Sequence, residues 1–422
     1  MTTIAGGRIR ITDLRNPVLT DSQRETWAYA EANPVELSVD AVLASAAEQA
    51  GLDDFGPDDF HERLALQLDE IDTDPNRSPV SRMVTFAGSV RYAANRLRVI
   101  DLLKRHPEIH DIEIEAPIVV VGLPRSGTTH LVNLLAADSR FRSLPLWESQ
   151  EPVPFEGDAV GPDGIDPRIV RSQRRWEQMQ AKSPLVAAMH PMNPEHIHEE
   201  LELECLDFSS YNFEWGSSMA PRWREYYLSH DQRPHYAFMA TMLKVLQWQR
   251  GPSRWILKCP QHLEQLGPLM DTFPDATVVM THRDPVSVVQ SAATMVGYGA
   301  RSNFLVPDID AVCDYWTDRV GRLLDAGTRD LALIPAERRI DVYFDKFMAD
   351  DVGTVERIYT HTGIEFTDEA RAAVDDHIAH HPRGANGQVV YDLRADFGRE
   401  PAELRTRFAD YFEKFPVKVE VQ

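Results

Sequence analysis

A short glycine-rich segment is the part of this 422-residue chain whose residue types and spacing most clearly suggest chemistry. Residues 122–129, GLPRSGTT, have the spacing of a phosphate-binding loop, G-x-x-x-x-G-x-[ST], after an apolar run. A threonine stands where loops that bind nucleoside triphosphates have a lysine, which weakens the case for a triphosphate. Backbone amides that open a helix point at an anion and add the helix dipole. The predicted anion contacts are Arg125, Ser126, Gly127, Thr128 and Thr129.

The sequence PRSGTT after an apolar strand resembles the 5′-phosphosulfate loop of sulfotransferases that use 3′-phosphoadenosine 5′-phosphosulfate (PAPS). In that family a lysine or arginine precedes Ser-Gly-Thr-Thr and neutralises the bridging oxygen, a role that the resemblance gives to Arg125. The resemblance covers roughly residues 116–400. It implies an α/β, three-layer P-loop-like fold, PAPS as the donor, no metal, and a small-molecule acceptor with a hydroxyl group.

A second segment matches the part of this family that holds the 3′-phosphate. The family has an arginine at the end of a later strand and a serine eight residues on, and here THRDPVSVVQS supplies Arg283 and Ser291. A guanidinium can hold a phosphate through two parallel hydrogen bonds. Ser291 would lie about two turns along the following helix. Alone, Arg283 would be interpreted as part of a surface ion pair, but the two motifs in this order favour a ligand.

The resemblance leaves the general base open. Lys258, at the end of RWILK, matches a family lysine and could contact the sulfuryl oxygens as charge moves to the leaving phosphate. Some relatives have a catalytic histidine two residues after it, whereas His262 is four residues after it and is equally well explained as a capping or packing residue. Other branches use a glutamate after the phosphate loop. Glu148, beside Trp147, is therefore favoured modestly, since burial could raise its pKa towards that of a useful base.

The acidic segment HIHEELELE, residues 196–204, is a further candidate for chemistry. Its histidines and first glutamate suggest a metal site, but the spacing is not H-E-x-x-H and no other clustered ligand supports one. We expect instead a helix beside the acceptor pocket, with His198 or Glu200 touching the acceptor and Trp147 nearby. If several aromatic side chains of this region line the pocket, a lipophilic alcohol, phenol, steroid or glycolipid is favoured.

Two weaker similarities lie towards the C-terminus. VYFDKFMAD, residues 342–350, is similar to a family strand that packs near the adenine, with Phe344 where a tyrosine is usual. HPRGANG, residues 381–387, resembles the loop that closes over the 3′-phosphate and makes Arg383 and Gly384 candidates for that role.

Alternating strands and helices predict a central parallel sheet covered by helices on both faces. The predicted domains are an N-terminal helical extension, residues 1–115, and a sulfotransferase domain, residues 116–422, with acceptor-pocket helices at about 150–250. Strands are expected at 118–121, 254–258, 276–281 and 339–344. Helices are expected at 38–51, 58–71, 81–106, from 127, 168–188, 196–206, 234–250, 262–271, 285–295, 310–326 and 352–363, with a surface loop at 157–166.

Composition limits the classes of function. The net charge is −22, which argues against a nucleic-acid partner. We find neither an apolar run of about 18 residues nor an apolar leader, so no transmembrane segment or signal peptide is expected. The three cysteines favour reduced thiols in the cytoplasm, and a homodimer is possible.

Two other functions were weighed against sulfuryl transfer. An ATP-dependent kinase on the same core would need a lysine at position 128 and an aspartate for Mg²⁺, and neither is evident. A non-catalytic nucleotide-binding protein would bind the bisphosphate product without turnover.

Overall fold

A five-stranded parallel sheet forms the centre of the computed structural model, which describes residues 2–4, 7–162 and 164–422. The strand order is β4–β5–β3–β6–β7. Every neighbouring pair is parallel, and Val120 of β3 is in register with Lys258 of β5. The strands are β3 (Ile118–Gly122), β4 (Phe141–Arg142), β5 (Arg254–Lys258), β6 (Thr277–His282) and β7 (Arg339–Tyr343).

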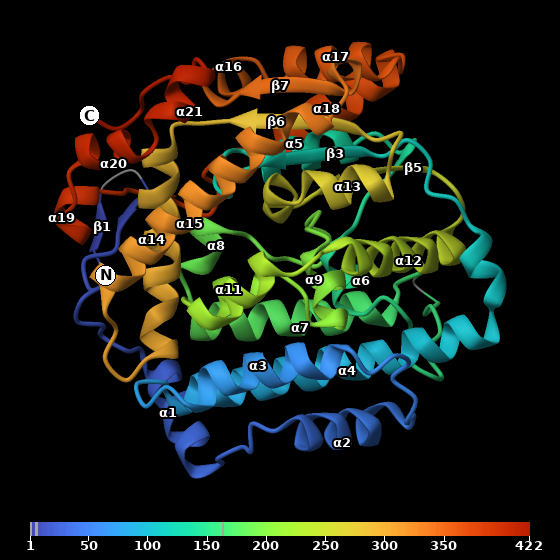
Figure 1. Cartoon of the computed structure of the whole chain (residues 1–422), viewed down its shortest axis with the longest axis vertical. Coiled ribbons are helices and arrows are strands. Elements are labelled where there is room, and N and C mark those ends of the chain that lie inside the picture. The colour runs from blue at the N-terminus through green and yellow to red at the C-terminus, as the bar shows by residue number, and fades with distance from the viewer. Residues whose placement is uncertain (1, 5–6, 163) are drawn as a thin grey trace.

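Helices cover both faces of this sheet, so the predicted α/β three-layer fold is confirmed (Figure 1). Successive residues of β3 alternate between two apolar clusters: Ile118 and Val120 join one, Val119 and Val121 the other. Both faces of a parallel sheet are normally buried, which explains the β-branched runs. One face is covered by α5 (Thr128–Ala136), α17 (Asp351–Thr362) and α18 (Asp368–His380). The other is covered by α12 (Arg233–Arg250), α13 (Leu266–Thr272), α14 (Pro285–Asn303) and α15 (Ile309–Asp330).

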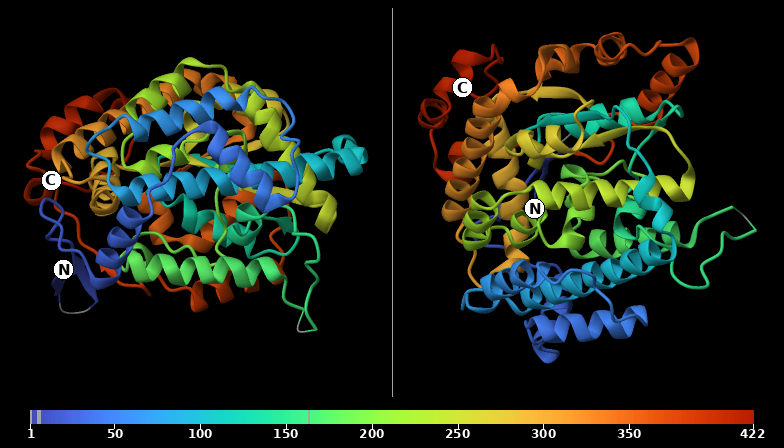
Figure 2. Two further views of the ribbon diagram at one scale, coloured as in Figure 1. Left: turned by 90° about the horizontal axis from the view of Figure 1, so that it is seen from below. Right: turned by 45° about the vertical axis from the view of Figure 1, so that its right-hand side comes forward.

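Four helices precede the sheet, and the sequence predicted three of them. They are α1 (Asp21–Ala32), α2 (Val39–Ala50), α3 (Phe60–Asp72) and α4 (Pro79–Arg105), and they form the lower part of the molecule in Figure 1 and in the right-hand view of Figure 2. The missed helix α1 has a clear start signal, since Thr20 caps it and Gln23 completes a capping box. Residues of α2, α3 and α4 share one apolar core with α12, α14 and α15.

A small second sheet joins the two ends of the chain. The hairpin of β1 (Thr2–Ile4) and β2 (Arg8–Arg10) pairs through β2 with β8 (Gln388–Val389), a contact across more than 370 residues. The strands have three, three and two residues, too few for hydrophobic periodicity to predict them.

The remaining helices are short except for α7, which has 16 residues, and most lie around the acidic segment and at the C-terminus. They are α6 (Leu146–Gln150), α7 (Pro167–Lys182), α8 (Val186–Met189), α9 (Leu201–Glu204), α10 (Asn212–Ser217), α11 (Pro221–Ser229), α16 (Phe344–Ala349), α19 (Leu393–Phe397), α20 (Pro401–Arg407) and α21 (Ala409–Lys414). Among the described residues, none of the helices is long and apolar enough to cross a membrane. The three cysteines are buried and free.

Four predicted elements were wrong in part. The helix predicted at 168–188 is divided into α7 and α8. The helix predicted at 196–206 is only α9 and a 3₁₀ turn, because residues 196–198 pair instead with 144–146 through backbone hydrogen bonds. The helix predicted at 262–271 is divided into a 3₁₀ turn (Pro260–Glu264) and α13. Phe344 begins α16 and does not end β7. In the loop predicted at 157–166, Asp163 lies outside the described residues and the others form no helix or strand.

A fully buried arginine of α15 gives the first prediction. Arg319 donates to Glu214 at 2.9 Å and to Glu264 at 2.6 Å, and all three side chains are at most 1% exposed. Arg319→Met leaves two buried carboxylates unpaired and should destabilise the fold by about 3–5 kcal/mol. Urea unfolding measures this against Arg322→Met, which removes a half-exposed ion pair on the same helix and should cost less than about 1 kcal/mol. Equal losses would contradict the argument.

Candidate functional site

The glycine-rich segment forms a tight turn between β3 and α5. Arg125 and Gly127 both have left-handed backbone angles, with φ of 65° and 87°. Gly122 has no room for a side chain, because a Cβ there would lie 2.0 Å from Thr281 Oγ1 on β6. Ser126 Oγ fixes the turn by bonding Leu123 O at 2.6 Å and Thr281 Oγ1 at 2.8 Å.

The first turn of α5 has the properties of an anion site. No side chain caps this helix, whose N-cap residue is Gly127. The first amides of a helix have no partner within the helix and point outward along its axis. Together with the positive end of the helix dipole, these amides can bind an anion at Thr128 and Thr129.

Lys258 lies beside this turn at the carboxyl end of β5. Its ammonium donates to Thr129 Oγ1 at 3.3 Å and forms a close ion pair with Glu199. Its backbone amide donates to both carboxylate oxygens of Glu200, at 2.8 and 3.2 Å. Since the Lys258 side chain is fully buried, the positive charge is held in a low-dielectric place where it acts strongly on a nearby anion.

His262 continues the same chain of contacts. Its Nε2 is 3.5 Å from a carboxylate oxygen of Glu200, and its Nδ1 is 2.7 Å from the hydroxyl of Tyr236 on α12. The ring is completely buried, and Nε2 makes no hydrogen bond with any described residue. This nitrogen is therefore available to a proton donor that enters the site.

The second predicted motif meets the loop directly. Arg125 Nε donates to Ser291 Oγ at 3.0 Å, and Arg283 Nη1 donates to the carbonyl of Arg125 at 2.5 Å. The Arg283 guanidinium lies 3.8 Å above the ring of Phe344, whose edge also contacts Gly127. Arg125, Gly127, Arg283, Ser291 and Phe344, named from separate segments, thus form one cluster.

A carboxylate from the C-terminal tail already occupies the Arg283 guanidinium. Glu420 accepts from Arg283 Nε at 2.8 Å and from Nη2 at 2.7 Å, and from Ser287 Oγ at 3.3 Å. The tail is held in place by Asp284, which accepts from the Glu420 amide at 2.7 Å. No motif in the tail pointed to Glu420, because a single glutamate has no distinctive spacing.

Two other predicted residues lie in ion-pair and packing environments. Glu148 on α6 is 1% exposed and bound by Arg142 at 2.8 Å and by Arg250 at 3.0 Å. The ring of Trp147 is 8% exposed and lies 4.6 Å from the guanidinium of Arg168. Neither residue has a contact with Lys258 like those of Glu199 and Glu200.

The C-terminal candidates lie at an exposed place. Arg383 forms an ion pair with Asp351 of α17 and lies 3.3 Å from His130 of α5. Gly384 has a φ of 77° and open space around its Cα. The contact with His130 brings this loop to α5, the helix that starts at the anion site. The guanidinium of Arg383 is, however, already paired with the carboxylate of Asp351.

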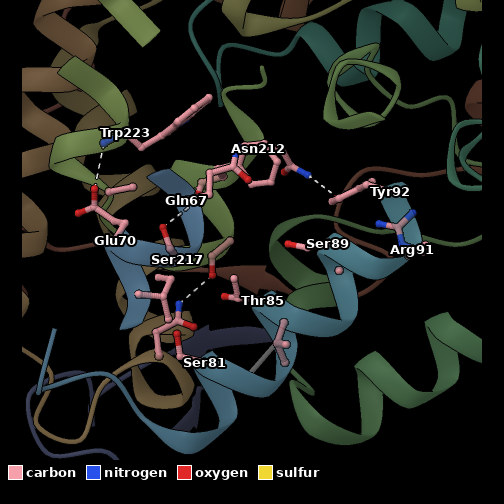
Figure 3. A pocket seen from close by; sticks show the side chains of 17 residues that line it. Gln67, Glu70, Ser81, Thr85, Ser89, Arg91, Tyr92, Asn212, Ser217 and Trp223 are labelled. Atoms are coloured by element: carbon pink, nitrogen blue, oxygen red, sulfur yellow. Dashed lines mark hydrogen bonds between the residues drawn. The ribbon is translucent and has the colours of Figure 1, made fainter. Parts of the chain in front are cut away.

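A cavity of about 210 Å³ lies among α3, α4, α10 and α11 (Figure 3). It has apolar walls that include Phe213 and Trp223, with Tyr92 and Asn212 at one side. These two polar residues hydrogen-bond the carboxylate of Glu202, at 3.4 and 3.2 Å. Glu202 belongs to α9, which directly follows Glu199 and Glu200. Two residues that line the cavity therefore bind the same acidic segment that contacts Lys258.

Sequence reasoning did not assign roles to four of these groups: Glu199, Tyr236, Tyr391 and Glu420. Glu199 lies in the segment that was expected to be helical. Tyr236, Tyr391 and Glu420 lie far from one another in the sequence and belong to no motif. The hydroxyl of Tyr391 lies 3.4 Å from Arg125 Nη2.

The model of the sulfotransferase family matches residues 117–368. The ω-hydroxy-β-dihydromenaquinone-9 sulfotransferase Stf3 of Mycobacterium bovis is 25% identical over 271 residues, which are 59% of this chain and 63% of the relative. The chain thus spans less than two thirds of that curated relative.

Two solved structures are similar over nearly the whole chain. Sulfotransferase STF9 from Mycobacterium avium is 27% identical, with a TM-score of 0.81 over 92% of this chain and 99% of that one. Sulfotransferase STF1 from Mycobacterium tuberculosis H37Rv is 28% identical, with a TM-score of 0.77 over 88% of this chain and 98% of that one. Since the family model covers more than half of the residues, this chain belongs to the sulfotransferase family.

Proposed function

We propose that this chain transfers the sulfuryl group of PAPS to a hydroxyl of a small lipophilic acceptor. The observation that carries the proposal is the cluster of Arg125, Arg283 and Ser291 against the phosphate loop, with Lys258 beside the same loop. A nucleotide with phosphates at both the 5′ and 3′ positions requires two anion sites of this kind, whereas a simple phosphate loop has one.

The residues fit the donor in charge and shape. The uncapped amides of α5 and Arg125 would hold the 5′-phosphosulfate, and Arg283 with Ser291 would hold the 3′-phosphate. The ring of Phe344 offers an apolar surface next to Gly127 and Arg283. When bound, the donor supplies an activated sulfuryl group and leaves as adenosine 3′,5′-bisphosphate.

The contacts support His262 as the general base. Its Nε2, which makes no hydrogen bond with a described residue and lies 3.5 Å from Glu200, can accept the hydroxyl proton, while Tyr236 binds Nδ1 and holds the ring. The ammonium of Lys258, once released from Glu199, would stabilise the charge that develops on the leaving group. Glu148 suits this role less well, because an arginine occupies each of its two carboxylate oxygens.

The apolar cavity of Figure 3 supports a lipophilic acceptor. The name of Stf3 describes a hydroxylated menaquinone as its substrate, which is likewise a lipophilic alcohol. We infer that the cavity holds the apolar part of the acceptor, with the acidic segment at residues 199–204 between it and Lys258. The division of the chain at residue 115, a cytoplasmic location and a homodimer stay predictions.

Thermal stability in the presence of nucleotides tests the proposed donor. Adenosine 3′,5′-bisphosphate at 100 times its Kd should stabilise the fold by about 2.7 kcal/mol, since it binds only the folded chain. ATP with Mg²⁺ should stabilise it much less, because position 128 has no lysine for the β- and γ-phosphates. Differential scanning fluorimetry measures both. Stabilisation by ATP with Mg²⁺ alone would favour a kinase and contradict the proposal.

A further inference from the structure

Three histidine rings lie together next to the phosphate loop. His190 directly follows α8, and His196 and His198 belong to the extended segment that pairs with residues 144–146. One ring nitrogen of each lies within 4.8 Å of the others. The ring centroids are 5.6, 6.1 and 6.4 Å apart.

The rings have unused nitrogens in a buried place. The side chain of His198 is 4% exposed, and its Nδ1 makes no hydrogen bond with a described residue. Nε2 of His196 is likewise buried and unpartnered. A buried polar atom without a partner costs about 1–3 kcal/mol, so a ligand that fills both positions would be stabilising. Two nitrogens of one cluster are therefore open to a ligand.

Charged side chains of both signs surround the three rings. The basic groups are Arg125 and Lys258, and the acidic groups are Glu199, Glu200 and Glu202. Arg91 pairs with Glu202 at 3.1 Å, so the net charge of this set is zero when all of its members are ionised. Burial is the main cause that lowers the pKa of all three histidines. The open ring nitrogens, and not the local charge, therefore carry the case for a ligand.

We propose that His190, His196 and His198 bind one divalent transition-metal ion, with Zn²⁺ as the best match. Zn²⁺ accepts imidazole nitrogens at about 2.0–2.1 Å in a tetrahedron, which requires nitrogens about 3.4 Å apart. The ring nitrogens now lie up to 4.8 Å apart, so they have to approach one another by roughly 1.4 Å when the ion binds. Three protein ligands leave the fourth position open, as in metal sites where water or a substrate oxygen binds.

This inference runs against the expectation that the chain binds no metal. The sequence showed His196, His198 and Glu199 together but no further clustered ligand, because His190 lies six residues before His196 and two prolines stand between them. The fold brings it to the other two rings. The metal site does not depend on the proposed sulfuryl transfer, since its test needs neither donor nor acceptor.

Calorimetric titration of the full chain, without a polyhistidine tag, with Zn²⁺ alone tests the site. We expect one ion per chain, and a loss of at least tenfold in affinity in His198→Gln and in His196→Gln. Co²⁺ should give the visible absorption bands of a four-coordinate ion in the unaltered chain only. Far-UV circular dichroism shows whether each variant is folded, and the second variant serves if the first is not.

A matched control excludes another pair of histidines. His377 and His381 are one turn apart on or just after α18, with ring centroids 4.3 Å apart, and could chelate a metal by themselves. His381→Gln should leave the Zn²⁺ affinity unchanged. Absence of binding to the unaltered chain, binding that survives both His198→Gln and His196→Gln, or binding that is lost in His381→Gln would overturn the proposal.

Discussion

Replacing His262 by glutamine is expected to slow sulfuryl transfer by about 10²–10⁴-fold, the usual contribution of a general base. Glutamine keeps a polar side chain of similar size beside Tyr236 and Glu200, but its amide cannot accept the hydroxyl proton. The affinity for adenosine 3′,5′-bisphosphate should stay within about threefold of the unaltered chain, because among the described residues the His262 side chain makes no hydrogen bond or ion pair with the phosphate loop or with Arg283. The effect should therefore appear in kcat.

A labelled donor and a panel of lipophilic alcohols and phenols provide the assay. Glu148→Gln is the contrasting variant, because it removes the other candidate for the base. It should lower the melting temperature, since Arg142 loses a buried partner, but the folded variant should retain kcat within about tenfold. Loss of kcat in Glu148→Gln with full activity in His262→Gln would reverse the assignment.

Chemical rescue separates a proton-transfer role from a structural one. Free imidazole added to His262→Ala should restore part of the lost rate, because it can occupy the vacated volume and accept the proton. A residue that only packs against Tyr236 would not be replaced by a soluble base. An equal response of Glu148→Ala to imidazole would count against the proposal.

The elements that could be predicted from the sequence are those determined by residues close together in the chain. Strands β3 and β6 are fully buried, so their apolar runs are unambiguous, and the phosphate loop has two glycines at positions where the backbone demands them. Arg283 and Ser291 were found because their spacing follows from one strand end and one helix. Each of these features depends on residues close together in the chain.

The parts that sequence missed depend on distant pairing. Residues 196–206 were predicted to form one helix. Backbone hydrogen bonds to residues 144–146 instead hold residues 196–198 in an extended conformation, and Glu199, which follows them, pairs with Lys258. Glu148 looked like a base because of its offset from the loop, but Arg142 and Arg250 are not adjacent to it in sequence. No local pattern contains such partners.

The second large effect concerns Arg283 and the C-terminal tail. Arg283→Ala should weaken binding of adenosine 3′,5′-bisphosphate by about 10–150-fold, since hydrogen bonds to a charged group contribute about 1.5–3 kcal/mol. Binding of 5′-AMP, which has no 3′-phosphate, should change by less than about threefold. Isothermal titration measures both ligands. Equal losses for the two nucleotides would contradict the assignment of the 3′-phosphate to Arg283.

Glu420 should act in the opposite direction. Its carboxylate accepts from Nε and Nη2 of Arg283, the edge of the guanidinium that a phosphate would use, so the nucleotide has to displace it. The pair is partly exposed, at 19% and 25%, which limits its strength to about 1 kcal/mol or less. Glu420→Gln is therefore expected to tighten bisphosphate binding by up to about fivefold. Glu413→Gln, an exposed glutamate on α21, removes the same charge elsewhere and should have no such effect.

Combining the two substitutions identifies where Glu420 acts. The Glu420 carboxylate is proposed to compete with the 3′-phosphate for the Arg283 guanidinium. In the Arg283→Ala background there is no guanidinium to compete for, so Glu420→Gln should no longer increase the affinity for the bisphosphate. The two free-energy changes are then not additive, and 5′-AMP shows no gain in either background. A gain of the same size with and without Arg283 would mean that the tail charge acts on the nucleotide through its general field, and not through this ion pair.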